Sequence, residues 1–412
     1  MGLNHSPRVV TDGLVMCLDI DNIKSYKGPP VQNILTHLTG SIINATGIVF
    51  NRGTEVVNIP EVGTVTSVTV TGYNDYPALS ASCCPNLYSY YSSFLNVSPN
   101  TLYTYAILYK VDSGYTHPNF MYRYEYTSGN VYVTEAGVHS NTNRTHLGNG
   151  WYWAWGTFTT QATTAKISTF SFYYQYRTSA NPDKMSVAKV LLVQGDYTKL
   201  HPKYWVDVNT TRANTQAILD LTGKNTITAN NLTYSNTGSF EFSGTGQFVS
   251  YNAAELASNT IEFVIYNPGG QSDVYPSIHQ QYGQQTTFGY TWIFLNGNST
   301  TIRYQYTGST VANEISWSNA APVGTYTHLA FVANHSAENV TMYKNGVLVS
   351  TQSTPGIKTI PAATAYIGNY GGSASTSYDL KATLTSYKVY NKALTSEEVK
   401  QNFNAIRGRY GL

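Results

Sequence analysis

Residues 324–350 read GTYTHLAFVANHSAENVTMYKNGVLVS and decide the fold of the region around them. Apolar and polar residues alternate through 326–333 and through 340–343, the pattern of strands with one buried and one solvent-facing side. The dipeptide Asn345-Gly346 follows, and it supplies the two left-handed residues of a tight hairpin turn. We therefore predict a β-hairpin that joins 340–344 to 347–351.

The C-terminal end of the chain carries a helix signature. Thr395-Ser-Glu-Glu398 is a capping box, because a Thr and a Glu three residues apart can each cap the other's backbone amide. Val399, Phe403 and Ile406 then form an apolar stripe with helical spacing, and Gly408 suits the end of a helix. We predict one short helix here.

The composition favours an all-β protein with a neutral surface. Only 11% of the 412 residues are charged, and the 36 tyrosines outnumber the 14 phenylalanines and 6 tryptophans together. Tyrosine is the aromatic residue that tolerates a half-wet strand face. The net charge of +2, without a long basic run, disfavours nucleic acid as a partner, and no apolar run is long enough to insert into a membrane.

Several short motifs in the C-terminal half resemble the centre of a laminin-G-like (concanavalin A-like) β-sandwich. They are the aromatic-x-His-Leu-Ala-aromatic-Val run at 326–332, Met-Tyr-Lys-Asn-Gly at 342–346, Tyr-Ile-Gly-Asn at 366–369 and the segment 386–394. The resemblance implies a jelly-roll sandwich closed by the C-terminal helix.

The opening of the chain resembles the first strand of the laminin-G-like domains found in virion proteins of tailed bacteriophages. This resemblance rests on Thr-Asp-Gly-Leu-Val at 11–15, followed by Leu-Asp at 18–19. The Asp-Leu-Thr-Gly turn expected next comes only at 220–223. An insertion explains the displacement, since inserted domains are tolerated at surface loops. We predict an N-terminal arm and first strand over 1–30, an inserted domain over 31–206 and the rest of the sandwich over 207–412.

The insert has its own strand pattern. Alternating runs separated by Gly-, Asn- and Ser-rich turns predict strands at 102–111, 120–127, 131–133, 151–159, 167–176 and 187–193. The order of motifs at 98–106, 150–155 and 188–197 resembles carbohydrate-binding-module-like jelly rolls. The expected fold class is all-β: a laminin-G-like sandwich split by a carbohydrate-binding-module-like β-sandwich.

Aromatic residues share strand faces in the insert and are the candidate carbohydrate-binding residues. Strand alternation places them in two sets, Trp151, Trp153 and Trp155, and Tyr122, Tyr124 and Tyr126. A sugar's C–H face stacks on an exposed ring while neighbouring polar groups bind its hydroxyls. The alternative is that these rings fill the core of the jelly roll, because alternation does not show which face is wet.

The sequence contains none of the common catalytic motifs: no Gly-x-Ser-x-Gly elbow, His-Glu-x-x-His, phosphate loop or Cys-x-x-Cys. His328 lies on a predicted strand, where a packed histidine is the usual reading, and acids such as Glu262 occur singly. The closely spaced acids of sandwich glycosidases are missing. We expect a protein that binds and does not catalyse.

The resemblance raises calcium as a cofactor, because many laminin-G-like domains bind one at the rim of the sandwich. Asp19, Asp21 and Asp220 are the weak candidate ligands, and oxygen ligands of this kind suit calcium. Many relatives have an acidic pair where this chain has Gly246-Gln247. That difference removes ligands, so we favour aspartates that cap turns.

The sequence as a whole resembles a bacteriophage virion structural protein, a fibre, spike or capsid decoration subunit on the head or tail. The resemblance implies a homo-oligomer, for which a trimer is the family expectation, that contacts other virion proteins and host-surface glycans. Two alternatives stay open: a polysaccharide depolymerase or its accessory module, and a secreted bacterial lectin.

Overall fold

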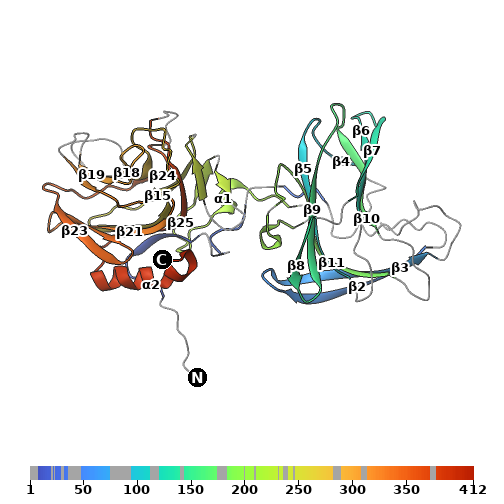
Figure 1. Ribbon diagram of the computed structural model, residues 1–412, viewed down its shortest axis with the longest axis horizontal. Helices are drawn as coiled ribbons and strands as arrows, with labels where there is room; N and C mark the ends of the chain where they lie inside the picture. The colour runs from blue at the N-terminus through green and yellow to red at the C-terminus, as the bar shows by residue number, and fades with distance from the viewer. Residues whose placement is uncertain are drawn as a thin grey trace, which may run out of the picture. The chain divides into compact units, whose positions relative to one another are not determined.

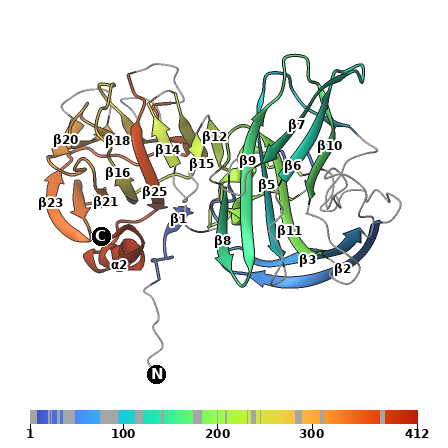
Figure 2. The same ribbon diagram turned by 45° about the vertical axis from the view of Figure 1, so that its right-hand side comes forward.

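The chain forms two compact units, each described here by itself (Figures 1 and 2). One unit contains Met1–Pro29 and Ala213–Leu412, and the other contains Pro30–Arg212. The computed structural model describes residues 8–19, 22, 24–28, 32–35, 48–74, 94–111, 120–139, 143–173, 183–198, 200–207, 210–230, 232–234, 240–244, 246–281, 289–307, 313–371 and 377–412. No helix in these ranges is long and apolar enough to cross a membrane.

The discontinuous unit is a sandwich of two antiparallel sheets. The first sheet has the order β13 (Thr233–Tyr234), β14 (Phe240–Ser243), β25 (Lys381–Tyr390), β16 (Asn259–Tyr266), β21 (Tyr326–Asn334), β22 (Asn339–Lys344), β23 (Val347–Ser353), and β1 (Leu14–Asp19) also pairs with β25. The second has the order β12 (Thr228–Asn230), β15 (Phe248–Ala253), β24 (Ala363–Ile367), β17 (Ser277–Gln281), β18 (Gly289–Leu295), β19 (Ile302–Thr307), β20 (Glu314–Trp317). Between the sheets, the ring of Phe331 stacks on Phe263 and Tyr304 at centroid distances of 5.9 and 6.1 Å.

The predicted hairpin joins β22 to β23. Asn345 and Gly346 have φ values of 51° and 72°, the left-handed conformation that this turn requires. The expectation of one wet face fails for β21, whose residues between its two ends are all buried. The second face is covered because Val10 of the N-terminal segment, Leu394 just before the C-terminal helix and Val399 within that helix pack against it.

The C-terminal helix, α2 (Ser396–Tyr410), begins with the predicted capping box. The Glu398 amide donates to Thr395 Oγ1 at 3.2 Å, and the Thr395 amide donates to Glu398 Oε2 at 2.9 Å. The prediction that the helix ends at Gly408 is wrong. The helix continues for two residues, and Gly411, with φ 68°, caps it in the left-handed conformation.

Strand β1 pairs with β25, which lies near the other end of the sequence, as expected from the displaced turn. Asp220 of that turn accepts a hydrogen bond from the Cys17 amide at 2.9 Å, and Asn225 Nδ2 donates to the Val15 carbonyl at 2.8 Å. The Leu219 amide donates to the Ser25 carbonyl at 2.7 Å. The chain therefore leaves and re-enters this unit at adjacent points. A short helix, α1 (Asn214–Ala217), stands at the re-entry.

The inserted unit is a second pair of antiparallel sheets. The larger sheet has the order β2 (Ile48–Ile59), β3 (Gly63–Asn74), β11 (Asp183–Gln194), β5 (Leu102–Val111), β9 (Trp151–Thr159), β8 (Arg144–Gly148). The smaller has the order β4 (Leu95–Asn96), β10 (Lys166–Tyr173), β6 (Phe120–Tyr126), β7 (Tyr132–His139). The hairpin of β2 and β3 and the strands β4 and β8 were not among the sequence predictions. A 3₁₀ turn, η1 (Pro202–Tyr204), follows the last strand.

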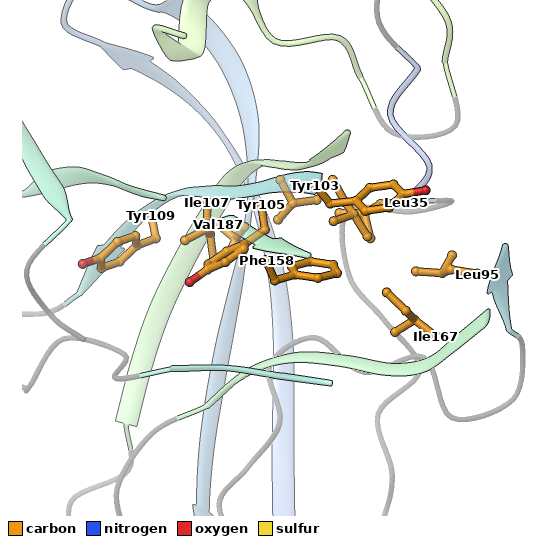
Figure 3. Close-up of a cluster of buried hydrophobic side chains, with 11 residues drawn as sticks. Leu35, Leu95, Tyr103, Tyr105, Ile107, Tyr109, Phe158, Ile167 and Val187 are labelled. Atoms are coloured by element: carbon orange, nitrogen blue, oxygen red, sulfur yellow. The ribbon is translucent and has the colours of Figure 1, made fainter. Parts of the chain in front are cut away.

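The core of the insert lies between its two sheets (Figure 3). The larger sheet contributes Tyr103, Tyr105, Ile107 and Phe158, and the smaller contributes Ile167. Burial raises the pKa of Tyr105 to about 12. These residues fix which side of each strand faces inward, and this assigns the two aromatic sets to their faces.

Candidate functional site

The tryptophan set lies on β9, on the face turned away from the smaller sheet. Tyr152, Ala154 and Phe158 point into the core, so the alternating residues Trp151 and Trp153 point outward. Even so, Trp151 and Trp153 are only 3% and 8% exposed. Trp155 is half-buried.

The outer face of β9 is covered by the segment that follows β11. The rings of His201 and Trp205 lie 5.7 and 6.4 Å from that of Trp153, and Trp155 lies 4.6 Å from it, centroid to centroid. Trp205 is itself 3% exposed, and its Nε1 donates to the Leu200 carbonyl at 2.8 Å. The prediction of a tryptophan platform for sugars is therefore corrected at Trp151 and Trp153, whose rings are packed.

The tyrosine set lies on β6 and has a different environment. Arg123 and Glu125 are buried between the sheets, so Tyr124 and Tyr126 project from the outer face of the smaller sheet, where both are half-buried. Tyr122 belongs to the same strand, and its side chain lies outside the described residues.

Two further rings, which the sequence analysis did not single out, complete this surface. Tyr132 on β7 is 52% exposed, and Phe94, just before β4, is 38% exposed. The ring of Tyr126 lies 5.9 Å from that of Tyr132 and 5.2 Å from that of Phe94, and Tyr124 lies 6.4 Å from Tyr132. We call Phe94, Tyr124, Tyr126 and Tyr132 the aromatic patch.

The aromatic patch rests on a buried ion pair. Glu125 Oε1 accepts from Arg123 Nε at 2.8 Å, and Glu125 Oε2 accepts from the Gln161 amide at 3.0 Å and from Thr164 Oγ1 at 2.6 Å. The Arg123 guanidinium also lies 4.2 Å above the centre of the Phe158 ring. Because these contacts fix β6 from beneath, the tyrosines above it are held on a rigid strand.

A lysine lies within the patch. Lys166 Nζ is 5.1 Å from the centre of the Phe94 ring, and it donates to the Ser128 carbonyl at 2.9 Å and to Asn130 Oδ1 at 2.8 Å. These bonds tie β10 to the turn between β6 and β7. The patch thus combines aromatic faces with one partly satisfied cation.

The candidate calcium ligands have other partners. Both oxygens of Asp19 accept from Arg409 at 2.8 Å. Asp220 caps its own turn, since it accepts from the Thr222 amide and hydroxyl and from Asn225, besides the Cys17 amide. Asp21 lies outside the described residues. Within the described ranges, no group of three or more His, Cys, Asp or Glu residues could hold a metal ion. Asp220 therefore caps a turn, whereas Asp19 is paired with Arg409.

Glu262 and His328 belong to a buried polar network beneath α2. Glu262 Oε1 lies 2.7 Å from His328 Nε2 and 3.5 Å from Lys388 Nζ, and Glu262 Oε2 accepts from Asn402 Nδ2 at 2.7 Å. Burial opposes ionisation of Glu262, but the charges of Lys388 and His328 and these hydrogen bonds prevail, and the pKa falls to about 2. Asn402 Oδ1 accepts from the Val10 amide at 2.7 Å. The network joins the two ends of the chain within one unit.

Comparison with known families identifies a concanavalin A-like domain. Residues 256–400 match the family described as the concanavalin A-like lectin/glucanases superfamily. The match falls within the discontinuous sandwich, as the hairpin motifs predicted, and the fold is all-β with one C-terminal helix of several turns. No curated protein sequence matches the chain.

Several solved structures are distantly similar. The binding domain of botulinum neurotoxin serotype D is 14% identical with a TM-score of 0.36, over 46% of this chain and 49% of that one. A heptameric SAP-like pentraxin from Limulus polyphemus is 18% identical with a TM-score of 0.32, over 39% and 79%. The CBM40 of a Ruminococcus gnavus IT-sialidase, bound to α2,3-sialyllactose, is 13% identical with a TM-score of 0.30, over 35% and 82%. The chain spans about half the length of the neurotoxin domain. These scores are too low to support an inference, and nothing in the matches indicates a bacteriophage origin.

Proposed function

We propose that the protein binds glycans through the aromatic patch and performs no catalysis of its own. The observation that carries this proposal is the group of neighbouring rings on the outer face of the smaller sheet, of which Tyr132 is 52% exposed. Exposed tyrosines suit sugars because the ring stacks on C–H groups while the phenol exchanges hydrogen bonds with hydroxyls. The rigid support from Arg123 and Glu125 reduces the ordering cost of binding.

A binding role is also consistent with the hydrogen bonding of three of the buried carboxylates. Glu125 and Glu262 are each held by several donors of the protein, and Asp220 is occupied in its turn. A glycosidase needs two carboxyl groups free to act on one bond. A polysaccharide-clearing assay on host capsular material separates the alternatives, because clearing would identify a depolymerase.

Each subunit is expected to bind weakly, with an affinity around the millimolar level, about −4 kcal/mol, because a few ring stacks and hydrogen bonds are its only contacts. Display in several copies raises the effective affinity by roughly 10²–10⁴ without new contacts. We therefore propose a homo-oligomer, with the trimer as the family expectation. Sedimentation at micromolar concentration tests this, and a strictly monomeric profile contradicts it.

We place the protein on the surface of a virion, as a fibre, spike or decoration subunit. This part of the proposal rests on the resemblance of residues 11–19 to the opening strand of phage virion proteins. Mass spectrometry of purified virions tests it. Recovery of the protein from bacterial culture supernatant, and from no virion, would favour the secreted lectin.

Replacing Tyr132 with alanine is expected to weaken glycan binding about fivefold, because one stacking ring contributes on the order of 1 kcal/mol. Tyr132→Phe keeps the ring and is expected to retain most of the binding. The measurement is a glycan array probed with multivalent protein.

Val131→Ala is the matched control, since Val131 is an exposed apolar neighbour, 64% exposed, outside the patch. Equal loss from Val131→Ala and Tyr132→Ala would indicate a general effect on the turn. Full binding by folded Tyr132→Ala would exclude the patch as the contact surface.

A further inference from the structure

A cavity of about 480 Å³ opens in the inserted unit at the end of β4. This volume falls in the range of small-molecule sites, roughly 300–1,000 Å³. Among the residues that the structure describes, no charged side chain lines it, and the described lining residues are Gln32, Ile34, Asn96, Val97, Ser98, Tyr103, Gln194 and Tyr197. An uncharged lining of this kind selects for a neutral ligand, since a buried charge without a partner is costly.

The polar groups of this cavity are available to a ligand. Gln32, Asn96 and Gln194 are exposed, and among the described residues their side-chain amides make no hydrogen bond. Each amide offers a carbonyl acceptor and two N–H donors, which match the paired donor and acceptor character of sugar hydroxyls. The half-buried ring of Tyr197 adds an aromatic surface.

The walls of the cavity are fixed before any ligand arrives. Asn33, fully buried, donates to the Val190 carbonyl at 2.9 Å and accepts from the Leu192 amide at 3.1 Å, which anchors the wall carrying Gln32 to β11. The Ser98 amide donates to the Tyr103 hydroxyl at 2.8 Å, and both residues line the cavity.

The wall that carries Tyr197 has its own anchor. Thr104 Oγ1 donates to the Gly195 carbonyl at 2.6 Å and accepts from the Tyr197 amide at 2.8 Å. Preformed walls lower the entropic cost of binding.

The register of the smaller sheet connects this cavity to the aromatic patch. Asn96 pairs with Lys166, Lys166 pairs with Tyr126, and Tyr126 pairs with Tyr132. Directly paired residues project from the same face of a sheet, so these four side chains form one row across β4, β10, β6 and β7. With strands about 4.8 Å apart, the row is about 14 Å long. Asn96 belongs to both features, because it also lines the cavity.

We propose that the cavity and the aromatic patch are two parts of one elongated site, which binds an internal stretch of a neutral oligosaccharide chain. This rests on the proposed glycan-binding function and specifies its ligand class. One sugar stacks on Tyr126 and Tyr132, the chain crosses β4 beside Asn96, and a following sugar enters the cavity, where Gln194 and Gln32 bind its hydroxyls. A single sugar cannot span the row, so affinity increases with chain length.

The test is saturation-transfer difference NMR on the full chain. The probes are neutral gluco- and manno-oligosaccharides of one to six residues, with oligogalacturonates as acidic comparators. The variants are Gln194→Ala at the cavity end and Tyr132→Ala at the patch end. Gln161→Ala is the matched control, because the side chain of Gln161 is an exposed amide of the same unit that lies outside the cavity. Circular dichroism verifies that each variant is folded.

The wild type is expected to bind a tetrasaccharide of the preferred series at least tenfold more tightly than its monosaccharide. Gln194→Ala and Tyr132→Ala are each expected to weaken tetrasaccharide binding about five- to tenfold, from the loss of one or two hydrogen bonds or of one stack. Gln161→Ala leaves it unchanged.

Three results would overturn the elongated site. The first is an affinity independent of chain length, and the second is a loss confined to only one of the two variants; both leave glycan binding itself intact. The third is a tighter, salt-sensitive response to the oligogalacturonates, which would show that Lys166 selects an acidic ligand. Binding to no glycan at all would refute the proposed function together with this inference.

Discussion

Glu262→Gln is expected to lower the free energy of unfolding of the discontinuous sandwich by about 3–5 kcal/mol. Glu262 is fully buried, and its carboxylate is the negative charge of a network that includes Lys388, 2% exposed, and His328. The glutamine keeps the shape and can still accept from Asn402. It removes the charge, and the ammonium of Lys388 then lies buried without a counter-charge.

The effect is expected to depend on pH in a defined direction. The pKa of Glu262 is lowered from its ordinary 4.5 to about 2 in the folded protein. A carboxyl group whose pKa is lower in the folded state than in the unfolded state stabilises the fold. This contribution is complete above the unfolded-state pKa and is lost as the pH falls through the folded-state pKa. The difference between wild type and Glu262→Gln should therefore be constant near neutrality and shrink between pH 4.5 and 2.

Urea unfolding followed by hydrogen exchange at the amides of β21 and β25 measures the loss in this unit alone. Glu255→Gln replaces an exposed acid of the same unit and should have the same free energy of unfolding as the wild type. The double variant Glu262→Gln/Lys388→Met should recover part of the loss, because it removes the uncompensated ammonium as well. A single Glu262→Gln variant as stable as the wild type at pH 7 would show that the network contributes nothing net to stability.

The sequence was informative where the decisive interactions are local. Asn345-Gly346 and the box at Thr395 and Glu398 specify a turn and a helix start within a few residues, and both form as predicted. The end of α2 was misjudged because Gly408 tolerates a helical conformation while Gly411, with its left-handed φ, provides the cap. The Asp220 turn was informative over a longer range, since its displacement from the first strand indicated the insertion.

The binding surface was harder to predict because exposure depends on distant segments. Alternation placed Trp153 on one face with the other tryptophans of its strand, and Tyr124 on one face with the other tyrosines of its strand. The segment that buries Trp153 lies near Trp205, about fifty residues later in the sequence. Tyr132 could have been found, because a tight turn after Tyr126 places it across the hairpin. The partners of Glu262 come from three other elements, and no local pattern reveals them.

Gly346→Val is expected to destabilise the same sandwich by about 2–6 kcal/mol, since a backbone cost and a packing cost combine. The residue has φ 72°, which costs a β-branched side chain roughly 1–3 kcal/mol. A Cβ atom here would also lie 2.8 Å from Cδ1 of Phe403 and 3.0 Å from its Cβ, and forced overpacking of this kind costs roughly another 1–3 kcal/mol. The hairpin turn touches α2, so strain in the turn is transmitted to the helix.

Gly356→Val separates the two costs. Gly356 has a nearly equal φ of 74°, and, its two chain neighbours apart, no heavy atom of a described residue lies within 4 Å of the position its Cβ would take. This variant should show the backbone cost alone, so its loss of stability in urea unfolding should be clearly smaller than that of Gly346→Val. The double variant Gly346→Val/Phe403→Ala should lose less stability than the two single variants lose together, because the alanine removes the clash. Equal losses for the two glycine variants, with strict additivity in the cycle, would show that the turn does not press on α2.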